Sequence, residues 1–141
     1  MNRLLLLLAF LTLGWTAVEA QIPDGSIAPD FTVTDVVSGN TYNLYDLLDQ
    51  GKTVYLDVFA TWCGPCWAYH NSGALEGIWD QYGPPGTDEA FVIAIEGDGA
   101  TNTNCIFGPS GCNNSTQGNW TAGTPYPIAD AADVASAYQI T

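Results

Sequence analysis

The chain has 141 residues, which is enough for one domain with a sizeable hydrophobic core. Fifteen Asp and Glu residues against two Lys and Arg give a formal net charge of −13 at pH 7. A surface this acidic repels phosphate backbones and anionic lipid headgroups, so the composition argues against proteins that bind nucleic acid or membrane surfaces.

The first twenty residues have the layout of a secretory signal peptide. Arg3 supplies a positive start, residues 4–13 form a nearly continuous apolar run, and Val18-Glu19-Ala20 matches a small-x-small cleavage site. An uncleaved membrane anchor is the alternative, but the run is short for a full span. We therefore expect a signal peptide at residues 1–20 and an exported chain, periplasmic or extracellular, at residues 21–141. Its net charge stays at −13, because the predicted signal peptide contains one Arg and one Glu.

Residues 21–52 predict a hairpin followed by a short helix. Residues 31–34 alternate like a strand, Ser38-Gly39-Asn40 is typical of a turn, and residues 41–44 can return as a second strand. A short helix is expected to begin at Leu44 and to end before Gly51.

Two buried strands with a helix between them are predicted next. Residues 53–60 are rich in β-branched and aromatic side chains, and residues 90–95 form a similar run. The helix begins at about Cys63 and ends at Gly83-Pro84-Pro85-Gly86. Its apolar stripe consists of Leu75, Ile78, Trp79 and Tyr82. Strands joined in this way form a right-handed βαβ unit with parallel pairing.

The remaining segment is less regular. Residues 97–124 are dense in Gly, Asn, Thr and Ser, and we expect one short helix near residues 114–120. A short strand at residues 126–129 and a helix at residues 131–138 complete the predicted elements. The fold class is therefore α/β.

The motif Cys63-Gly64-Pro65-Cys66 joins the end of a predicted strand to the start of a helix. A thiol at this place faces unpaired backbone N–H groups and the positive end of the helix dipole. Both favour the thiolate, which is the species that attacks disulfides. The second sulfur lies within the same turn and can release the mixed disulfide. A purely structural disulfide or half of a zinc site are the alternatives. The sequence offers no matching zinc ligands, so we expect no metal and no cofactor.

Two further cysteines, Cys105 and Cys112, bracket a loop that contains Gly108, Pro109 and Gly111. Four cysteines allow three pairings, and the sequence alone does not choose among them. The spacings suggest a Cys63–Cys66 pair and a Cys105–Cys112 pair. We interpret the second pair as a structural staple, with a second redox pair as the alternative.

The run Trp62-Cys63-Gly64-Pro65-Cys66 resembles the active site of the thioredoxin superfamily. The entry Ala28-Pro29-Asp30-Phe31 and residues 53–62 resemble its TlpA/ResA-like and AhpC/TSA-like branches. The similarity covers residues 26–96 well and residues 125–140 weakly. It implies a thioredoxin-like fold with a central mixed β-sheet, flanking helices and an N-terminal β-hairpin. By this resemblance Cys63 is the nucleophile, Cys66 the resolving thiol and Trp62 a shield for the pair, with Gly64 and Pro65 as active-site support.

Asp57 interrupts an otherwise apolar strand, on the face shared with Tyr55 and Phe59. It matches the position where thioredoxins keep a buried acid beneath the active site. A buried carboxylate is costly unless it has a partner or a task. We interpret Asp57 as the proton acceptor for Cys66, and a carboxylate in a polar pocket is the alternative.

His70, the single histidine, follows Cys63 by seven residues, or roughly 10 Å along a helix. That distance is too long for direct Cys–His pairing, so we expect a solvated helix residue.

The end of the sequence departs from the thioredoxin pattern. Thr124-Pro125 is a candidate for the family's cis-proline, but only sixteen residues follow Pro125. They cannot supply two strands, a turn and a helix. We therefore expect residues 21–141 to form a thioredoxin-like domain whose C-terminal part is missing, with an uncovered sheet edge.

The sequence thus predicts an exported thiol–disulfide oxidoreductase acting on protein thiols and disulfides, together with an unknown redox partner, and a monomer. A peroxiredoxin-like peroxidase is one alternative. No proline precedes Cys63 at the offset usual for peroxidases, which disfavours it. A non-catalytic binding module is another, and it would not require both thiols of Cys63 and Cys66.

Overall fold

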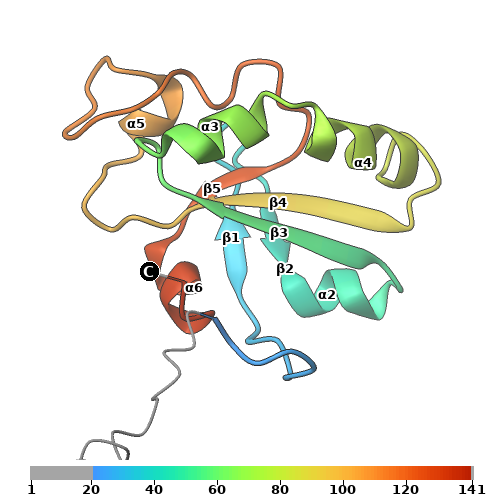
Figure 1. Ribbon diagram of the computed structural model, residues 1–141. Coiled ribbons are helices and arrows are strands. Elements are labelled where there is room, and N and C mark those ends of the chain that lie inside the picture. The colour runs from blue at the N-terminus through green and yellow to red at the C-terminus, as the bar shows by residue number, and fades with distance from the viewer. Residues whose placement is uncertain (1–20, 141) are drawn as a thin grey trace, which may run out of the picture.

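The computed structural model describes residues 21–140, so the predicted signal peptide lies outside the described residues. Three helices, α3 (Gly64–His70), α4 (Ala74–Tyr82) and α5 (Asn104–Phe107), lie on one side of the central sheet (Figure 1). The hairpin and the helices α2 (Leu44–Asp49) and α6 (Ala132–Ala137) lie on the other side. The fold class is α/β, as predicted.

The central sheet consists of β3 (Thr53–Phe59), β4 (Ala90–Glu96) and β5 (Ile128–Asp130), in the order β3-β4-β5 with parallel pairing throughout. Every residue of β4 is buried, because a strand between two neighbours with helices on both faces meets no solvent. The free edge of β3 has no strand partner among residues 21–140. The βαβ unit therefore has the predicted strands and the predicted pairing.

Antiparallel pairing occurs in the hairpin of β1 (Thr32–Thr34) and β2 (Thr41–Asn43). Asp35, just after β1, joins this hairpin to β5. Its Oδ1 accepts the Ile128 N–H at 3.1 Å, and its Oδ2 accepts the N–H and hydroxyl of Ser38 at 2.9 and 2.6 Å. Burial acts to raise the pKa of Asp35, but these hydrogen bonds outweigh it and the pKa is lowered.

The long predicted helix is in fact two helices, so that prediction was wrong in one respect. Helix α3 ends at His70, and α4 starts at Ala74 after Gly73, which has a left-handed φ of 78°. This conformation is easy for glycine and interrupts the helical hydrogen bonds. Leu75 and Trp79 of the predicted stripe are buried, and the end at Gly83 is as expected.

The segment between β4 and β5 also differs from expectation. Its helix is α5, near the first cysteine of the second pair, and residues 114–120 form bends and irregular structure instead. Cys105 and Ile106 of α5 are fully buried. The helix lies at this position because these two side chains pack into the core. The composition of the loop did not indicate which of its residues would be buried.

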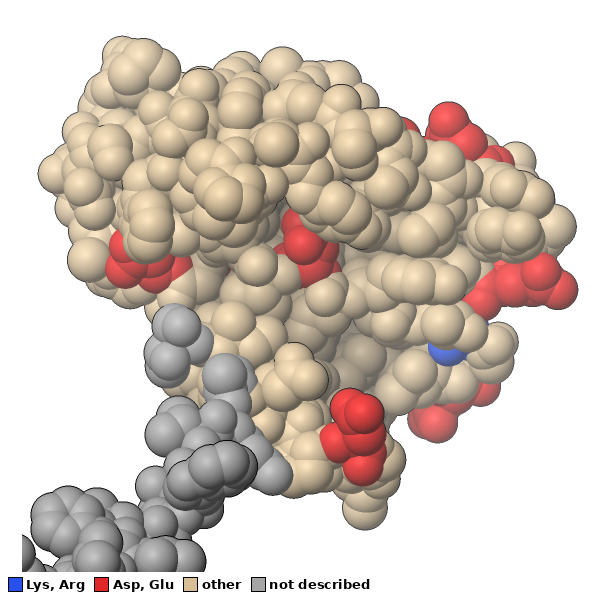
Figure 2. Space-filling view, in the orientation of Figure 1, with Lys and Arg blue, Asp and Glu red and all other residues tan. Residues whose placement is uncertain are grey.

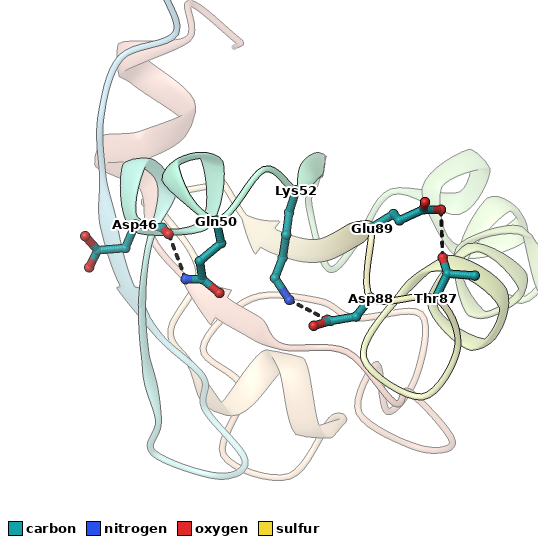
Figure 3. Close-up of polar contacts among 6 residues, drawn as sticks. All are labelled: Asp46, Gln50, Lys52, Thr87, Asp88 and Glu89. Carbon is teal, nitrogen blue, oxygen red and sulfur yellow. Dashed lines mark hydrogen bonds and ion pairs between the residues drawn. The ribbon is translucent and has the colours of Figure 1, made fainter.

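On the face drawn in Figure 2, Asp and Glu form separate groups among other residues. Lys52, the single Lys or Arg after residue 20, pairs with Asp88 at the start of β3 and β4, and Figure 3 shows this ion pair. Asp57 lies five residues after Lys52, so this ion pair lies at the end of β3 opposite the cysteine motif.

Among residues 21–140, no helix has the length and apolar character needed to cross a bilayer. The same residues contain no cis peptide bond, so the bond before Pro125 is trans and this proline is not the expected cis-proline.

Candidate active site

The first cysteine pair lies where the sequence placed it, at the junction of β3 and α3. Cys63 is the N-cap residue of α3, with φ −72° and ψ 108°, and its Sγ accepts the N–H of Cys66 at 3.2 Å. The two sulfurs form a disulfide. Pro65 occupies the first turn, where its missing N–H costs no helical hydrogen bond. Both cysteines are half-buried, and Gly64 and Pro65 are exposed.

Trp62 lies beside the disulfide and is 48% exposed. Its indole N–H donates to Asp98 Oδ2 at 2.7 Å, and this bond is the main reason that the pKa of Asp98 is lowered. Gln117 Nε2 donates to the Trp62 carbonyl at 2.8 Å. Trp62 is therefore oriented by two residues that sequence reasoning did not identify. Asp98 comes two residues after the end of the buried strand β4, and ends of parallel strands meet at one edge of a sheet, so this signal was available.

A groove of about 380 Å³ runs along the disulfide on the side of α6. Residues from the motif, from β3, from the loop after β4 and from α6 line it. They include Trp62, Cys63, Cys66, Val58, Gly97 and Ala135. The disulfide is thus open to a partner that approaches along this groove.

Asp57 lies on β3, in register with Ala94 of β4, on the same face of the sheet as Phe59. Burial raises the pKa of the Asp57 carboxyl, because an ionised group loses hydration in an apolar environment. Burial also raises the pKa of Tyr126, and the charges of Glu76 and Asp57 add to this effect. Asp57 therefore has a half-buried environment in which a proton is retained to higher pH than in water.

A second buried acid, Glu96, ends β4 and was not identified from the sequence. It is 1% exposed, and neither carboxylate oxygen has a hydrogen-bond partner. Burial raises the pKa of Glu96, and the nearby Asp130 carboxylate raises it further. The signal for it was a single charged residue at the end of an otherwise apolar run.

Comparison with known proteins agrees with this geometry. The family model described as Redoxin matches residues 23–102, which is more than half of the chain. The chain belongs to the Redoxin family. It is 36% identical over 72 residues to the thiol-disulfide oxidoreductase ResA of Geobacillus thermodenitrificans, a match that covers 47% of this chain and 40% of that protein. It is 35% identical over 77 residues to the thioredoxin-like protein YneN of Bacillus subtilis, covering 55% and 40%.

A crystal structure of a Bacteroides vulgatus protein assigned as a thiol-disulfide oxidoreductase is also similar. The sequence identity is 26% and the TM-score 0.48, with 75% of this chain and 60% of that chain covered. The Redoxin match and the ResA and YneN relatives make this a TlpA/ResA-like member of the thioredoxin superfamily. The chain spans about two-fifths of the length of these two relatives.

The segment after β4 packs against the cysteine motif of this Redoxin chain. Thr61, which is buried, donates its hydroxyl to the Ser115 carbonyl at 3.0 Å and accepts the Gln117 N–H at 2.9 Å. The Trp120 ring stacks on Phe59 with 4.2 Å between centroids. Cys105 is disulfide-bonded to Cys112. The segment that carries the second pair therefore forms one wall of the site.

His70 is not solvated, so that prediction was wrong. It is 6% exposed, stacks on Trp67 at 5.5 Å and lies 5.0 Å from the Trp120 ring. Its Nε2 is 3.5 Å from the Thr124 hydroxyl. Burial lowers the pKa of His70, which keeps the imidazole neutral. Only the packing of the distant segment against α3 covers this side chain, and helix periodicity could not show it.

No group of three or more His, Cys, Asp or Glu side chains within residues 21–140 is arranged to hold a metal ion. The described site therefore has two sulfurs, the half-buried acid Asp57, the buried acid Glu96 and an aromatic wall as its chemical groups.

Proposed function

We propose that this chain is an exported thiol–disulfide oxidoreductase that exchanges disulfides with protein substrates through Cys63 and Cys66. The observation that carries the proposal is the position of Cys63 at the N-cap of α3, bonded to Cys66 one turn later and open to a groove. The ResA and YneN relatives support the same class of reaction, over the part of their length that this chain spans.

In the reduced form, the N-terminus of α3 favours the thiolate of Cys63 through its unpaired N–H groups and its dipole. Cys63 Sγ attacks one sulfur of a substrate disulfide, whose bond breaks, and the other substrate sulfur leaves as a thiolate that takes up a proton. Cys66 then loses its proton and attacks Cys63 Sγ. This step breaks the mixed disulfide, releases the second substrate thiol and forms the Cys63–Cys66 bond that the structure holds. Two electrons pass to the substrate, and a partner dithiol returns them.

Asp57 is proposed to accept the proton of Cys66 during the second step. Its raised pKa suits this role, because a base works best when its pKa lies near the working pH. The positively charged Lys52 is held by Asp88, so it does not compete for the Asp57 carboxylate.

Export is supported by two features. The first is the arrangement of charge, apolar run and small residues before Gln21. The second is the Cys105–Cys112 bond, which we interpret as a structural disulfide, since such bonds persist in oxidising compartments.

The test is reduction of insulin by the full chain with dithiothreitol as electron source. Cys63→Ser should abolish turnover, and Cys66→Ser should trap a mixed disulfide that mass spectrometry detects. The double variant Cys105→Ala/Cys112→Ala is the matched control, because it removes two sulfurs from the wall and none from the reaction. Full turnover by Cys63→Ser would contradict the proposal. Loss of turnover in the control would assign the chemistry to the second pair only if the control keeps the urea midpoint and circular dichroism spectrum of the wild type.

A further inference from the structure

Glu96 lies at the point where the three strands of the sheet end together. It is in register with Phe59 of β3 and with Asp130 of β5. The next residue, Gly97, donates its N–H to the Phe59 carbonyl at 2.8 Å. Glu96 thus lies at the base of the loop that leads from β3 to the nucleophile.

This carboxyl group does not stabilise the fold in any visible way. It is 1% exposed, and both of its oxygens lack a hydrogen bond. A buried carboxyl without partners costs free energy in either protonation state, and more when it is ionised. The other residues of β4 on both faces are apolar and buried. An apolar side chain would therefore fill this position at lower cost, which suggests a functional reason for an acid.

The groups that face Glu96 come from three elements. The Thr61 N–H belongs to the loop after β3, and the Thr101 hydroxyl and Asp98 N–H belong to the loop after β4. They are close enough to favour the ionised form, but none makes a hydrogen bond of normal geometry. The Asp130 carboxylate on β5 opposes ionisation. Asp57 lies on the same face of the sheet, one strand away and two residues further down.

The proximity to Cys63 follows from the chain. The Thr61 N–H lies near the Glu96 carboxyl without a hydrogen bond to it, and Thr61 precedes Cys63 by two residues, at most about 7 Å. A charge on Glu96 is therefore on the order of 10 Å from Cys63 Sγ. At the effective dielectric constant of about 20 that suits protein interiors, two like charges at this distance change each other's acidity by about one pH unit, or tenfold.

We propose that Glu96 is a positioning residue for the Cys63–Cys66 couple. When Glu96 is protonated, the Cys63 thiolate is favoured and the disulfide is easier to reduce, and when Glu96 is ionised, both are disfavoured. This inference rests on the proposed function. A donor dithiol breaks the Cys63–Cys66 bond and becomes a disulfide itself. One of its two protons goes to Cys66 Sγ, and Cys63 is left as the thiolate. The other proton goes to the Glu96 carboxylate where Glu96 is ionised, and to solvent where Glu96 already carries a proton. The coupling is reciprocal, so the thiolate favours protonated Glu96 by the same factor.

The experiment measures the reduction potential of the couple in the full chain between pH 5 and 9. Thiol–disulfide buffers fix the reduction potential of the solution. The protein is then alkylated, and mass spectrometry of the peptide that contains Cys63 and Cys66 reports the redox state of this pair separately from that of the second pair. The wild-type curve should contain a bend where Glu96 titrates, and Glu96→Gln should remove it. On the alkaline side of the bend, the wild type should be about tenfold harder to reduce than Glu96→Gln, which is about 30 mV for a two-electron couple.

Asp130→Asn is the matched control, because Asp130 is exposed and acts on Glu96 only through its charge. It should move the bend to lower pH without removing it. If Glu96→Gln does not fold, this shift tests whether Glu96 is the group whose titration causes the bend. Parallel curves for wild type and Glu96→Gln, or a wild-type curve without a bend, overturn the inference. Failure of the proposed function is a separate result, seen when wild-type Cys63 alkylates with the pKa of an ordinary thiol and insulin is not reduced.

Discussion

The wall formed by residues 97–124 depends on Trp120, and its truncation gives a prediction that can be worked from the structure. Trp120 is 0% exposed and contacts the rings of Phe59, Trp67 and His70. A buried Trp removes about 200 Å² from water, which at about 25 cal/mol per Å² is worth about 5 kcal/mol. This is an upper estimate, because the unfolded chain already covers part of that surface.

We therefore expect Trp120→Ala to lower the free energy of unfolding by about 3–5 kcal/mol, the range usual for large buried aromatics. Urea unfolding followed by far-UV circular dichroism measures this value. Tyr82→Ala is the matched control, because Tyr82 is 42% exposed at the end of α4 and its loss should cost less than about 1 kcal/mol. Equal losses for the two variants would refute the reasoning that Trp120 holds the wall against the site.

Three further predictions concern titratable side chains. Asp57→Asn should slow release of the mixed disulfide at neutral pH without unfolding the domain, as measured by quenched-flow alkylation, and an unchanged rate would leave Asp57 a structural role. The lowered pKa of His70 means that the unfolded state takes up the proton first, so stability should fall as pH drops below about 6.5. His70→Gln should lack that component in urea titrations, and identical pH profiles would contradict it. Asp35→Ala leaves the buried Ile128 N–H without an acceptor and should cost about 1–3 kcal/mol in thermal or urea unfolding, against almost nothing for the exposed Asp49→Ala.

Most of the elements could be predicted from the sequence, because each depends on neighbours along the chain. The strands β3 and β4 appear as apolar runs, and the hairpin appears as two alternating segments around Ser38-Gly39-Asn40. The position of Cys63 at a helix start also follows from the local pattern, since Pro65 suits a first turn and β3 ends just before it. The helix break at Gly73 was missed because the apolar stripe that predicted the helix, Leu75 to Tyr82, lies entirely after Gly73 and says nothing about the residues before it.

The sequence by itself determined where the two sulfurs lie relative to a strand end and a helix start, because three residues and one turn fix that geometry. Only the tertiary structure decided what surrounds them. Trp120 covers His70, Asp98 orients Trp62, and Glu96 is enclosed at the meeting of three strand ends. These contacts join residues that are far apart in the chain, and burial, which sets the acidity of Glu96 and His70, is a property of the packed molecule and not of any local segment.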